Sequence, residues 1–226
     1  MDHKSTVLRG QTLSQVLSLQ HLTIHKGGER LLQIHTEVPA QSVLTIMGPS
    51  GCGKTTLLNA ISGQLSAPFV MQGDICINGR SVVAIPPHKR KVGIMFQDAL
   101  LFEHMSVKEN IAFAIPPERY RSKKAQSIAI DRLLENVSLS GFGDRSIDAL
   151  SGGQQARISL LRTLAAEPDV VLLDEPFSKL DASLRAQIRQ WTFDEIKRRD
   201  IPAVLVTHDK EDAQAADGEV IEIMPC

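Results

Sequence analysis

A glycine-rich turn between an apolar run and a helical stretch is the sequence feature that most constrains the fold. Residues 48–56 read GPSGCGKTT and directly follow the apolar run SVLTIM. Gly48, Gly53, Lys54 and Thr55 meet the spacing G-x-x-x-x-G-K-[ST], in which glycines let successive backbone N–H groups point at phosphate oxygens. The N-terminus of a helix that follows the loop adds a favourable dipole for an anion. This segment therefore predicts a strand, a phosphate-binding loop and a helix, in that order.

Five short apolar runs predict a parallel sheet around this loop. Their hydrophobicity is continuous rather than alternating, which is typical of strands covered on both faces. The runs lie at 42–48, 91–97, 169–175, 203–209 and 219–224. Helical stretches fall between several of them, at 54–65, 158–167 and 183–200. Strands that alternate with helices indicate a doubly wound α/β core.

Two regions do not follow this alternation. Residues 17–38 and 70–85 indicate short antiparallel strands with turns at KGGE and INGR. The stretch from about 98 to 150 contains little strand signal and predicts an inserted helical subdomain. We expect residues 1–16 to be a flexible N-terminal extension, followed by one nucleotide-binding domain at 17–226.

The composition is that of a globular chain and argues against several other classes. Hydrophobic residues make up 42% of the 226 residues and the formal net charge is −1, so the chain lacks the basic field of many nucleic-acid binders. No window approaches the roughly 18 consecutive apolar residues of a membrane-spanning helix, and the polar N-terminus lacks a secretory signal. Three separate cysteines suggest neither a disulfide framework nor a zinc site. We therefore expect a cytoplasmic protein that binds no nucleic acid.

Polar residues end several of the predicted strands, where an open α/β sheet binds its ligands. Asp174 ends the run VVLL, and a buried carboxylate is costly unless it meets a cation, for which Mg²⁺ shared with the Thr55 hydroxyl is the expected partner. Glu175 follows, placed to polarise a water for in-line attack on a γ-phosphate. Gln97 and His208 end two other strands in the same way.

A second anion-binding pattern lies downstream of the phosphate loop. Residues 150–154 read LSGGQ and open a helix whose apolar face carries Ile158, Leu161 and Ala165. A serine and free backbone N–H groups at a helix N-terminus make a good receptor for phosphate. One chain thus carries two patterns suited to binding phosphate. A single nucleotide bound within one chain would require only one of them.

The ordered motifs resemble those of the ATP-binding-cassette (ABC) ATPase family, over residues 17–226. They are GPSGCGKTT, FQ at 96–97, LSGGQ at 150–154, LLDEP at 172–176, SKLD at 178–181 and TH at 207–208. The resemblance implies a P-loop nucleoside triphosphatase core of the RecA-like type, with an antiparallel β subdomain and a helical subdomain that carries the signature LSGGQ. It also implies ATP hydrolysis coupled to transmembrane transport, with ATP and Mg²⁺ in the site.

In that family two cassettes face each other head to tail, and each ATP lies between the phosphate loop of one chain and the signature of the other. The resemblance implies catalytic roles for Glu175, His208 and Gln97, and metal contacts from Thr55, Gln97 and Asp174. On the phosphate side the nucleotide would meet Gly48, Pro49, Ser50, Gly51, Cys52, Gly53, Lys54, Thr55 and Thr56. The signature of the second chain would contribute Ser151, Gly152, Gly153 and Gln154, with Asp181 at the dimer interface.

The partners are likewise implied by resemblance. Residues 96–115 resemble the segment of bacterial importers that docks against a membrane partner after the glutamine, in the branch that handles thiamine, sulfate, molybdate and polyamines. This implies transmembrane permease subunits, a periplasmic or extracellular solute-binding protein and a second copy of the chain, at the cytoplasmic face of the plasma membrane. The alternatives are an ATPase of an export or lipid and lipoprotein extraction system, and a soluble ABC ATPase outside transport.

One position departs from the family pattern. Near residues 24–27 the family usually offers an aromatic side chain on which adenine stacks, and this chain reads IHKG. Lys26 falls at that position, with His25 beside it. We therefore expect stacking that is weaker or supplied by His25.

Overall fold

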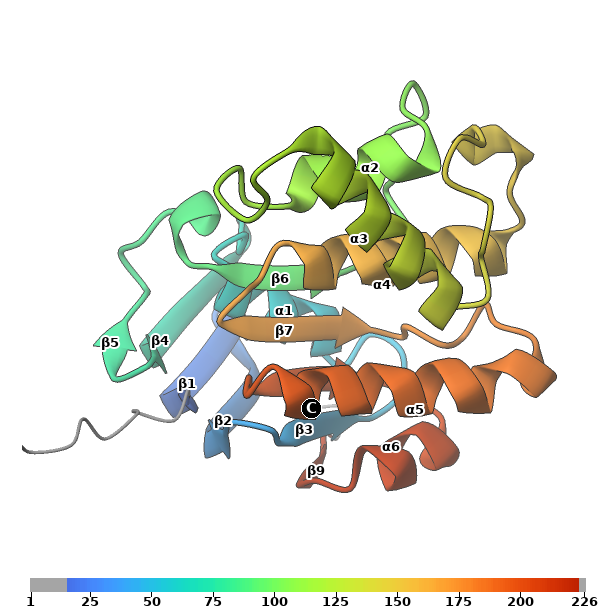
Figure 1. The fold of residues 1–226 in the computed structure, drawn as a ribbon. Coiled ribbons are helices and arrows are strands. Elements are labelled where there is room, and N and C mark those ends of the chain that lie inside the picture. Colours follow the sequence, from blue (N-terminus) through green and yellow to red (C-terminus); the bar gives the residue numbers. More distant parts are fainter. Residues whose placement is uncertain (1–15, 224–226) are drawn as a thin grey trace, which may run out of the picture.

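Two sheets and a group of helices make up the part of the chain that the structure describes, residues 16–223 (Figure 1). The structure is a computed structural model. The structure does not describe residues 1–15 and 224–226. The expected extension at 1–16 therefore lies outside the described residues apart from Val16, which belongs to a strand.

The larger sheet is parallel and has the strand order β6-β7-β8-β3-β9. Its strands are β3 (Val43–Met47), β6 (Val92–Met95), β7 (Val170–Asp174), β8 (Ala203–Val206) and β9 (Val220–Glu222). All five runs of continuous hydrophobicity form strands, which confirms the α/β core. The strands are shorter than expected, and Gln97 and His208 lie in the loops beyond β6 and β8, because the backbone leaves the sheet before it reaches them.

The two faces of this sheet are covered differently. Successive residues of a strand point to opposite faces, so Leu172 packs toward α1 (Lys54–Ser62) and the second sheet, whereas Val171 packs toward the other helices. Those helices are α4 (Gly152–Ala165) and α5 (Ala182–Arg198). Every residue of β7 and β8 is buried, which is why these runs show no hydrophobic alternation.

The second sheet is antiparallel, in the order β2-β1-β4-β5. Its strands are β1 (Val16–Lys26), β2 (Glu29–Pro39), β4 (Phe69–Ile77) and β5 (Arg80–Ser81). The turns at KGGE and INGR are confirmed, with Asn78 in the left-handed region at φ 53°. The predicted strand region 70–85 was placed slightly wrong: pairing begins at Phe69 and ends at Ser81, and Pro87–Lys89 form the short 3-10 helix η1.

The inserted segment is helical, as expected. It contains α2 (Val107–Ala114), α3 (Lys123–Asn136) and the 3-10 helix η2 (Ile147–Ala149). Ser106 begins α2 with a reciprocal capping box to Glu109, and the fully buried Asn110 hydrogen-bonds the backbone of the preceding loop. These helices pack on α4 and so attach the insert to the core.

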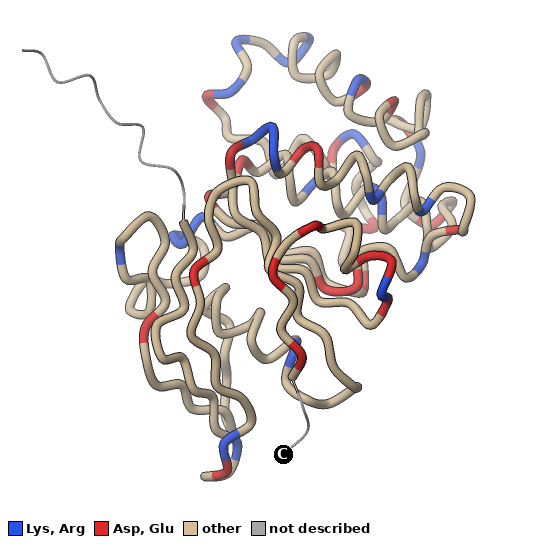
Figure 2. Tube along the Cα trace, turned by 90° about the horizontal axis from the view of Figure 1, so that it is seen from below, with Lys and Arg blue, Asp and Glu red and all other residues tan. Residues whose placement is uncertain are grey.

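The last helix, α6 (Lys210–Ala216), was not expected from the sequence. It packs beside α5 and β3 (Figure 1). Lys, Arg, Asp and Glu are spread along the trace with both signs interspersed (Figure 2), in keeping with the near-neutral net charge. Within residues 16–223, no helix has the length and apolar character needed to cross a bilayer.

Candidate functional site

The phosphate loop follows β3 and leads into α1 through backbone conformations that need glycine. Gly53 is the N-cap of α1 at φ 100°, and a Cβ placed on it would lie 3.0 Å from the Leu31 side chain. Gly48 has φ 148°, and a Cβ there would lie 2.5 Å from the carbonyl oxygen of Ile223. The loop is therefore held against both its own sheet and the antiparallel sheet, and side chains at these two positions would push it out of shape.

Lys54 lies inside the curve of the loop. Its ammonium donates hydrogen bonds to the carbonyl oxygens of Gly48 at 2.7 Å and Pro49 at 2.8 Å, and the residue is only 9% exposed. Cys52 is buried next to Gly48, whereas Ser50 and Gly51 are exposed at the rim. A buried cation with only carbonyl partners is well placed to bind an anion that enters the loop.

Thr55 and Asp174 form the next part of the site. The Thr55 hydroxyl donates to the Asp174 carboxylate at 2.9 Å, across from the first turn of α1 to the end of β7. Burial raises the pKa of the Asp174 carboxyl; the hydrogen bond from Thr55 opposes this rise and the charge of Glu175 adds to it. A carboxylate that is 6% exposed and forms no ion pair with any other residue of 16–223 is suited to a divalent ion.

The donor set fits Mg²⁺ held mainly by other oxygens. Among residues 16–223 there is no cluster of three or more His, Cys, Asp or Glu that could hold a metal unaided. Mg²⁺ usually takes one or two protein oxygens and completes its shell with phosphates and waters. The Thr55 hydroxyl and the Asp174 carboxylate would supply those protein oxygens.

The three residues expected to act in catalysis come together beyond neighbouring strands. Glu175 follows β7 in the left-handed region at φ 48°, a conformation that is uncommon for a residue with a side chain. One of its carboxylate oxygens accepts a hydrogen bond from the Gln97 amide at 3.3 Å, and the other lies 3.1 Å from Nδ1 of His208. The structure thus brings Gln97, Glu175 and His208 into one cluster at the carboxyl edge of the sheet.

The backbone before His208 is held by a buried charge cluster that the sequence did not suggest. Asp212 is 1% exposed and accepts hydrogen bonds from Arg185 at 2.7 Å, Arg189 at 3.0 Å and the Thr207 hydroxyl at 3.2 Å. It joins α5, α6 and the loop that carries His208. The sequence feature that could have indicated this cluster was the spacing of the two arginines, which lie four residues apart on one face of a predicted helix.

The signature residues, expected to bind phosphate, form the N-terminus of α4. Ser151 is the N-cap of α4 and forms a capping box with Gln154, in which each side chain accepts from the other's backbone N–H. A Cβ on Gly153 would lie 2.9 Å from the carbonyl oxygen of Lys179, whereas Gly152 has open space around it. The first N–H groups of α4 are left without intrahelical partners, as at any helix N-terminus.

Asp181 lies at the end of the segment that begins at Glu175, where it is the N-cap of α5. In the same segment Lys179 pairs with the exposed Asp98, the residue after Gln97, at 2.9 Å. Within the described chain, no hydrogen bond joins the signature to the phosphate loop. The predicted site residues therefore fall into two groups that no hydrogen bond joins within the described chain.

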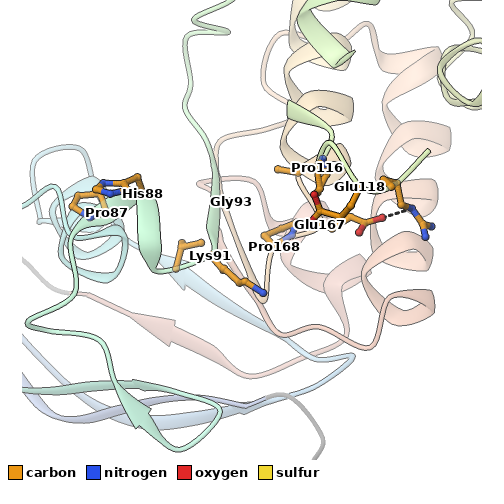
Figure 3. A pocket seen from close by; sticks show the side chains of 11 residues that line it. Pro87, His88, Lys91, Gly93, Pro116, Glu118, Glu167 and Pro168 are labelled. Carbon is orange, nitrogen blue, oxygen red and sulfur yellow. Dashed lines mark ion pairs between the residues drawn. The ribbon is translucent and has the colours of Figure 1, made fainter. Parts of the chain in front are cut away.

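A cavity of about 590 Å³ lies elsewhere, at the opposite end of the parallel strands (Figure 3). Lys91 and Pro168, which precede β6 and β7, line it, and Glu167 in its wall pairs with Arg119 at 2.6 Å. Since the phosphate loop and Glu175 follow the carboxyl ends of their strands, this cavity is separate from the candidate site.

Comparisons with known proteins agree with this geometry. A family model described as ABC transporter matches residues 31–178. The uncharacterised ABC transporter ATP-binding protein YnjD of Escherichia coli K12 is 40% identical over 209 residues, covering 92% of this chain and 95% of that protein. The sulfate/thiosulfate import ATP-binding protein CysA of Neisseria meningitidis is 41% identical over 209 residues, covering 91% of this chain and 58% of that protein.

CysA of Mycobacterium tuberculosis is 45% identical over 179 residues, covering 78% of this chain and 49% of that protein. The chain thus spans nearly the whole of YnjD and about half the length of the CysA proteins. Among solved structures, a dimeric structure of MJ0796, described as a bacterial ABC transporter cassette, matches with TM-score 0.78 and 26% identity, covering 92% of this chain and 94% of that one. A dimeric post-hydrolysis state of MJ0796 bound to ADP and Pi matches with TM-score 0.76 and 27% identity, over the same shares. These matches confirm the fold class expected from the sequence.

Proposed function

This chain is an ATPase of the ABC transporter family, and we propose that two copies bind ATP between them, head to tail, to drive solute import. The observation that carries the proposal is the division of the site into two receptors. The phosphate loop lies with Asp174 and Glu175, whereas Ser151 and the free N–H groups of α4 form a second receptor with no hydrogen bond to the loop. A second chain would bring that receptor to the γ-phosphate, and the dimeric MJ0796 cassettes support the pairing of two chains by analogy.

The chemistry follows from the groups at the carboxyl edge of the sheet. Lys54 and the N–H groups of the loop bind the phosphates, and the signature of the second chain binds the γ-phosphate. Mg²⁺, held by Thr55 and Asp174 with Gln97 close by, would neutralise charge on the phosphate oxygens. Glu175 accepts a proton from the water that attacks phosphorus, the bond to the β-phosphate oxygen breaks, and ADP and phosphate leave. His208 orients Glu175 and contacts the γ-phosphate.

ATP binding would close the dimer and hydrolysis would open it, because only ATP carries the γ-phosphate that bridges the two receptors. Gln97 links this event to the helical subdomain, since the chain runs from it directly into the insert. Arg162 on α4 holds that loop by donating to the carbonyl oxygens of Ala99 at 3.2 Å and Leu100 at 3.0 Å. A change at the nucleotide is thus transmitted to the insert through the loop after Gln97.

An exposed apolar surface beside this loop supports membrane-spanning subunits as partners. Leu100 is 60% exposed and Phe113 on α2 is 66% exposed, and the Phe113 ring meets Phe102 edge to face with centroids 5.0 Å apart. Large apolar side chains gathered on a surface are typical of a protein contact. We place the permease there, which would hold the cassette at the cytoplasmic face of the plasma membrane.

Import is favoured over export by the relatives whose names state a direction, the sulfate/thiosulfate import proteins CysA. The transported solute would contact the membrane subunits rather than the cassette. An importer of this type would also use a solute-binding protein outside the membrane. Export or lipid extraction remains the second candidate, because the cassette fold serves both directions.

The test is to recover the tagged Glu175→Gln chain with Mg-ATP from detergent-solubilised membranes and identify its partners by mass spectrometry. A membrane-spanning permease recovered with a solute-binding protein would support import, and a permease from an operon with no such protein would favour export. Recovery without any membrane-spanning partner would contradict a transport role. The matched control is the same chain carrying Leu100→Asp and Phe113→Asp, which should lose the permease and still bind ATP.

A further inference from the structure

The inner face of the antiparallel sheet lies against the phosphate loop. A Cβ on Gly53 would lie 3.0 Å from the Leu31 side chain and 3.1 Å from that of Leu32. Leu32 on β2 pairs with Ile24 on β1, which pairs with Met71 on β4. These three paired residues form one rung across the sheet, and it is the rung in contact with the loop.

The next rung on this face carries an aromatic ring. Side chains alternate along a strand, so Lys26 shares the face of Ile24 and Phe69 shares the face of Met71. Lys26 and Phe69 are paired partners, and the Lys26 ammonium lies 5.9 Å from the centre of the Phe69 ring. Two residues along a strand span about 6.6 Å, so this rung lies one step outward from the loop.

The pairing also places His25 on the wrong face for the role expected from the sequence. His25 pairs with Val70, which is 60% exposed, on the outer face of the sheet. Phe69, in contrast, is partly buried, with one side packed on the core cluster that includes Ile24. The part of its ring that stays exposed lies beside the exposed Lys26 side chain.

We propose that Phe69 is the platform on which the adenine of bound ATP stacks, in place of the aromatic side chain that position 26 lacks. The inference rests on the proposed function, because it requires the phosphate loop to bind ATP. With the phosphates in the loop, the ribose and base would extend beyond it, and Phe69 lies one rung beyond the contact between the sheet and the loop. A purine stacks on an aromatic ring through its π-face, and the aliphatic stem of Lys26 would border it.

The first measurement is the affinity of the full chain for ATP, ADP and inorganic triphosphate by calorimetry. Phe69→Ala should weaken ATP and ADP binding by roughly tenfold, the size typical of a lost base–aromatic stack, and leave triphosphate binding unchanged. The matched controls are Val70→Ala and His25→Ala, the neighbouring pair on the outer face. Both should bind ATP as the parent chain does.

Two conservative variants separate stacking from packing. Phe69→Tyr should keep the parent affinity for ATP, and Phe69→Leu, which still fills the apolar site, should lose it. ATP binding at the parent affinity in both Phe69→Ala and Phe69→Leu would overturn the platform and leave ATP binding itself intact. An equal loss of affinity for ATP and for triphosphate in both variants would also overturn the platform. Phe69 would then act only by packing the antiparallel sheet against the phosphate loop. A parent chain that binds neither ATP nor triphosphate would instead contradict the proposed function.

Discussion

Nδ1 of His208 lies 3.1 Å from a carboxylate oxygen of Glu175, although the residues are 33 positions apart in the chain. The other oxygen of that carboxylate accepts from Gln97, so Glu175 is held from two sides. The three residues follow β8, β7 and β6, which are adjacent in the sheet. Parallel strands end at one edge, and this brings three residues that are distant in the sequence into contact.

Replacing Glu175 by Gln should abolish turnover and leave nucleotide binding intact. The amide keeps the size of the side chain but accepts no proton, and loss of a general base costs about 10²- to 10⁴-fold in rate. ATP should therefore accumulate in a closed dimer. Phosphate release measures the first effect, and sedimentation with Mg-ATP and Mg-ADP measures the second. Hydrolysis near the parent rate would mean that Glu175 is not the base.

Ser151→Arg should stop hydrolysis without weakening ATP binding to the isolated chain. The substitution fills the signature receptor with a bulky cation at the helix N-terminus. Within the described chain, the signature has no hydrogen bond to the phosphate loop. Nucleotide affinity of the monomer and phosphate release by the dimer are the two measurements. Weaker binding by the monomer would contradict a role across the dimer.

A mixture of two inactive variants tests the head-to-tail arrangement directly. Ser151→Arg retains its phosphate loop, and Lys54→Ala retains its signature. Combined, they form a heterodimer with one intact site, so phosphate release should reappear on mixing. Each variant alone is the control. A mixture that stays inactive, although it dimerises, would mean that the two receptors do not meet across chains.

Asp174→Asn should stabilise the free chain while it removes Mg²⁺-dependent hydrolysis. Burial raises the pKa of this carboxyl, so its ionised form is less favourable in the folded chain than in the unfolded chain. The resulting loss of folding stability grows as the pH rises above the ordinary pKa of 3.8. At neutral pH the amide avoids this cost, so the melting temperature should rise. For a chain of this size, each ~1 kcal/mol gained in the free energy of unfolding raises the melting temperature by roughly 2–4 °C. Differential scanning calorimetry and phosphate release measure the two effects. A lower melting temperature would show that the carboxylate stabilises the fold.

Asp212→Asn should destabilise the chain by about 3 kcal/mol, because two arginines lose the buried carboxylate that they share. The loop before His208 loses its anchor at the same time, so kcat should fall more than the KM for ATP rises. Urea unfolding and steady-state kinetics are the measurements. The control is Glu211→Gln, since Glu211 is exposed and lies 3.6 Å from Arg189. Equal effects in the two variants would contradict a specific role of Asp212.

Glu195 should give the chain stability that disappears in acid. Burial alone would raise the pKa of Glu195, but the hydrogen bonds and charges of Arg198 and Arg199 together lower it. A lowered pKa contributes stability above the ordinary value of 4.5, and this is lost as pH falls through the pKa of the folded chain. Glu195→Gln should therefore be less stable than the parent at neutral pH, and the difference should shrink below pH 4.5. Urea unfolding across this range tests it, with Asp194→Asn as the control.

Much of the core could be predicted because its signals are local. The continuous apolar runs mark β3, β6, β7, β8 and β9 without reference to any other part of the chain, and the spacing of Gly48, Gly53 and Lys54 specifies the phosphate loop. The polar residues that follow the runs identified Gln97, Glu175 and His208 as candidates. The predicted ends of the strands differ from the observed ends by a few residues, because the apolar residues continue into the loops after the strand pairing stops.

What the sequence determined by itself was therefore the kind of each element and the chemistry at its end, because both depend on residues close together in the chain. The tertiary structure decided which distant residues meet: Asp212 with Arg185, and Phe69 with Lys26. Strand order and register set those contacts, and they depend on how whole faces pack. No periodicity within one segment carries that information.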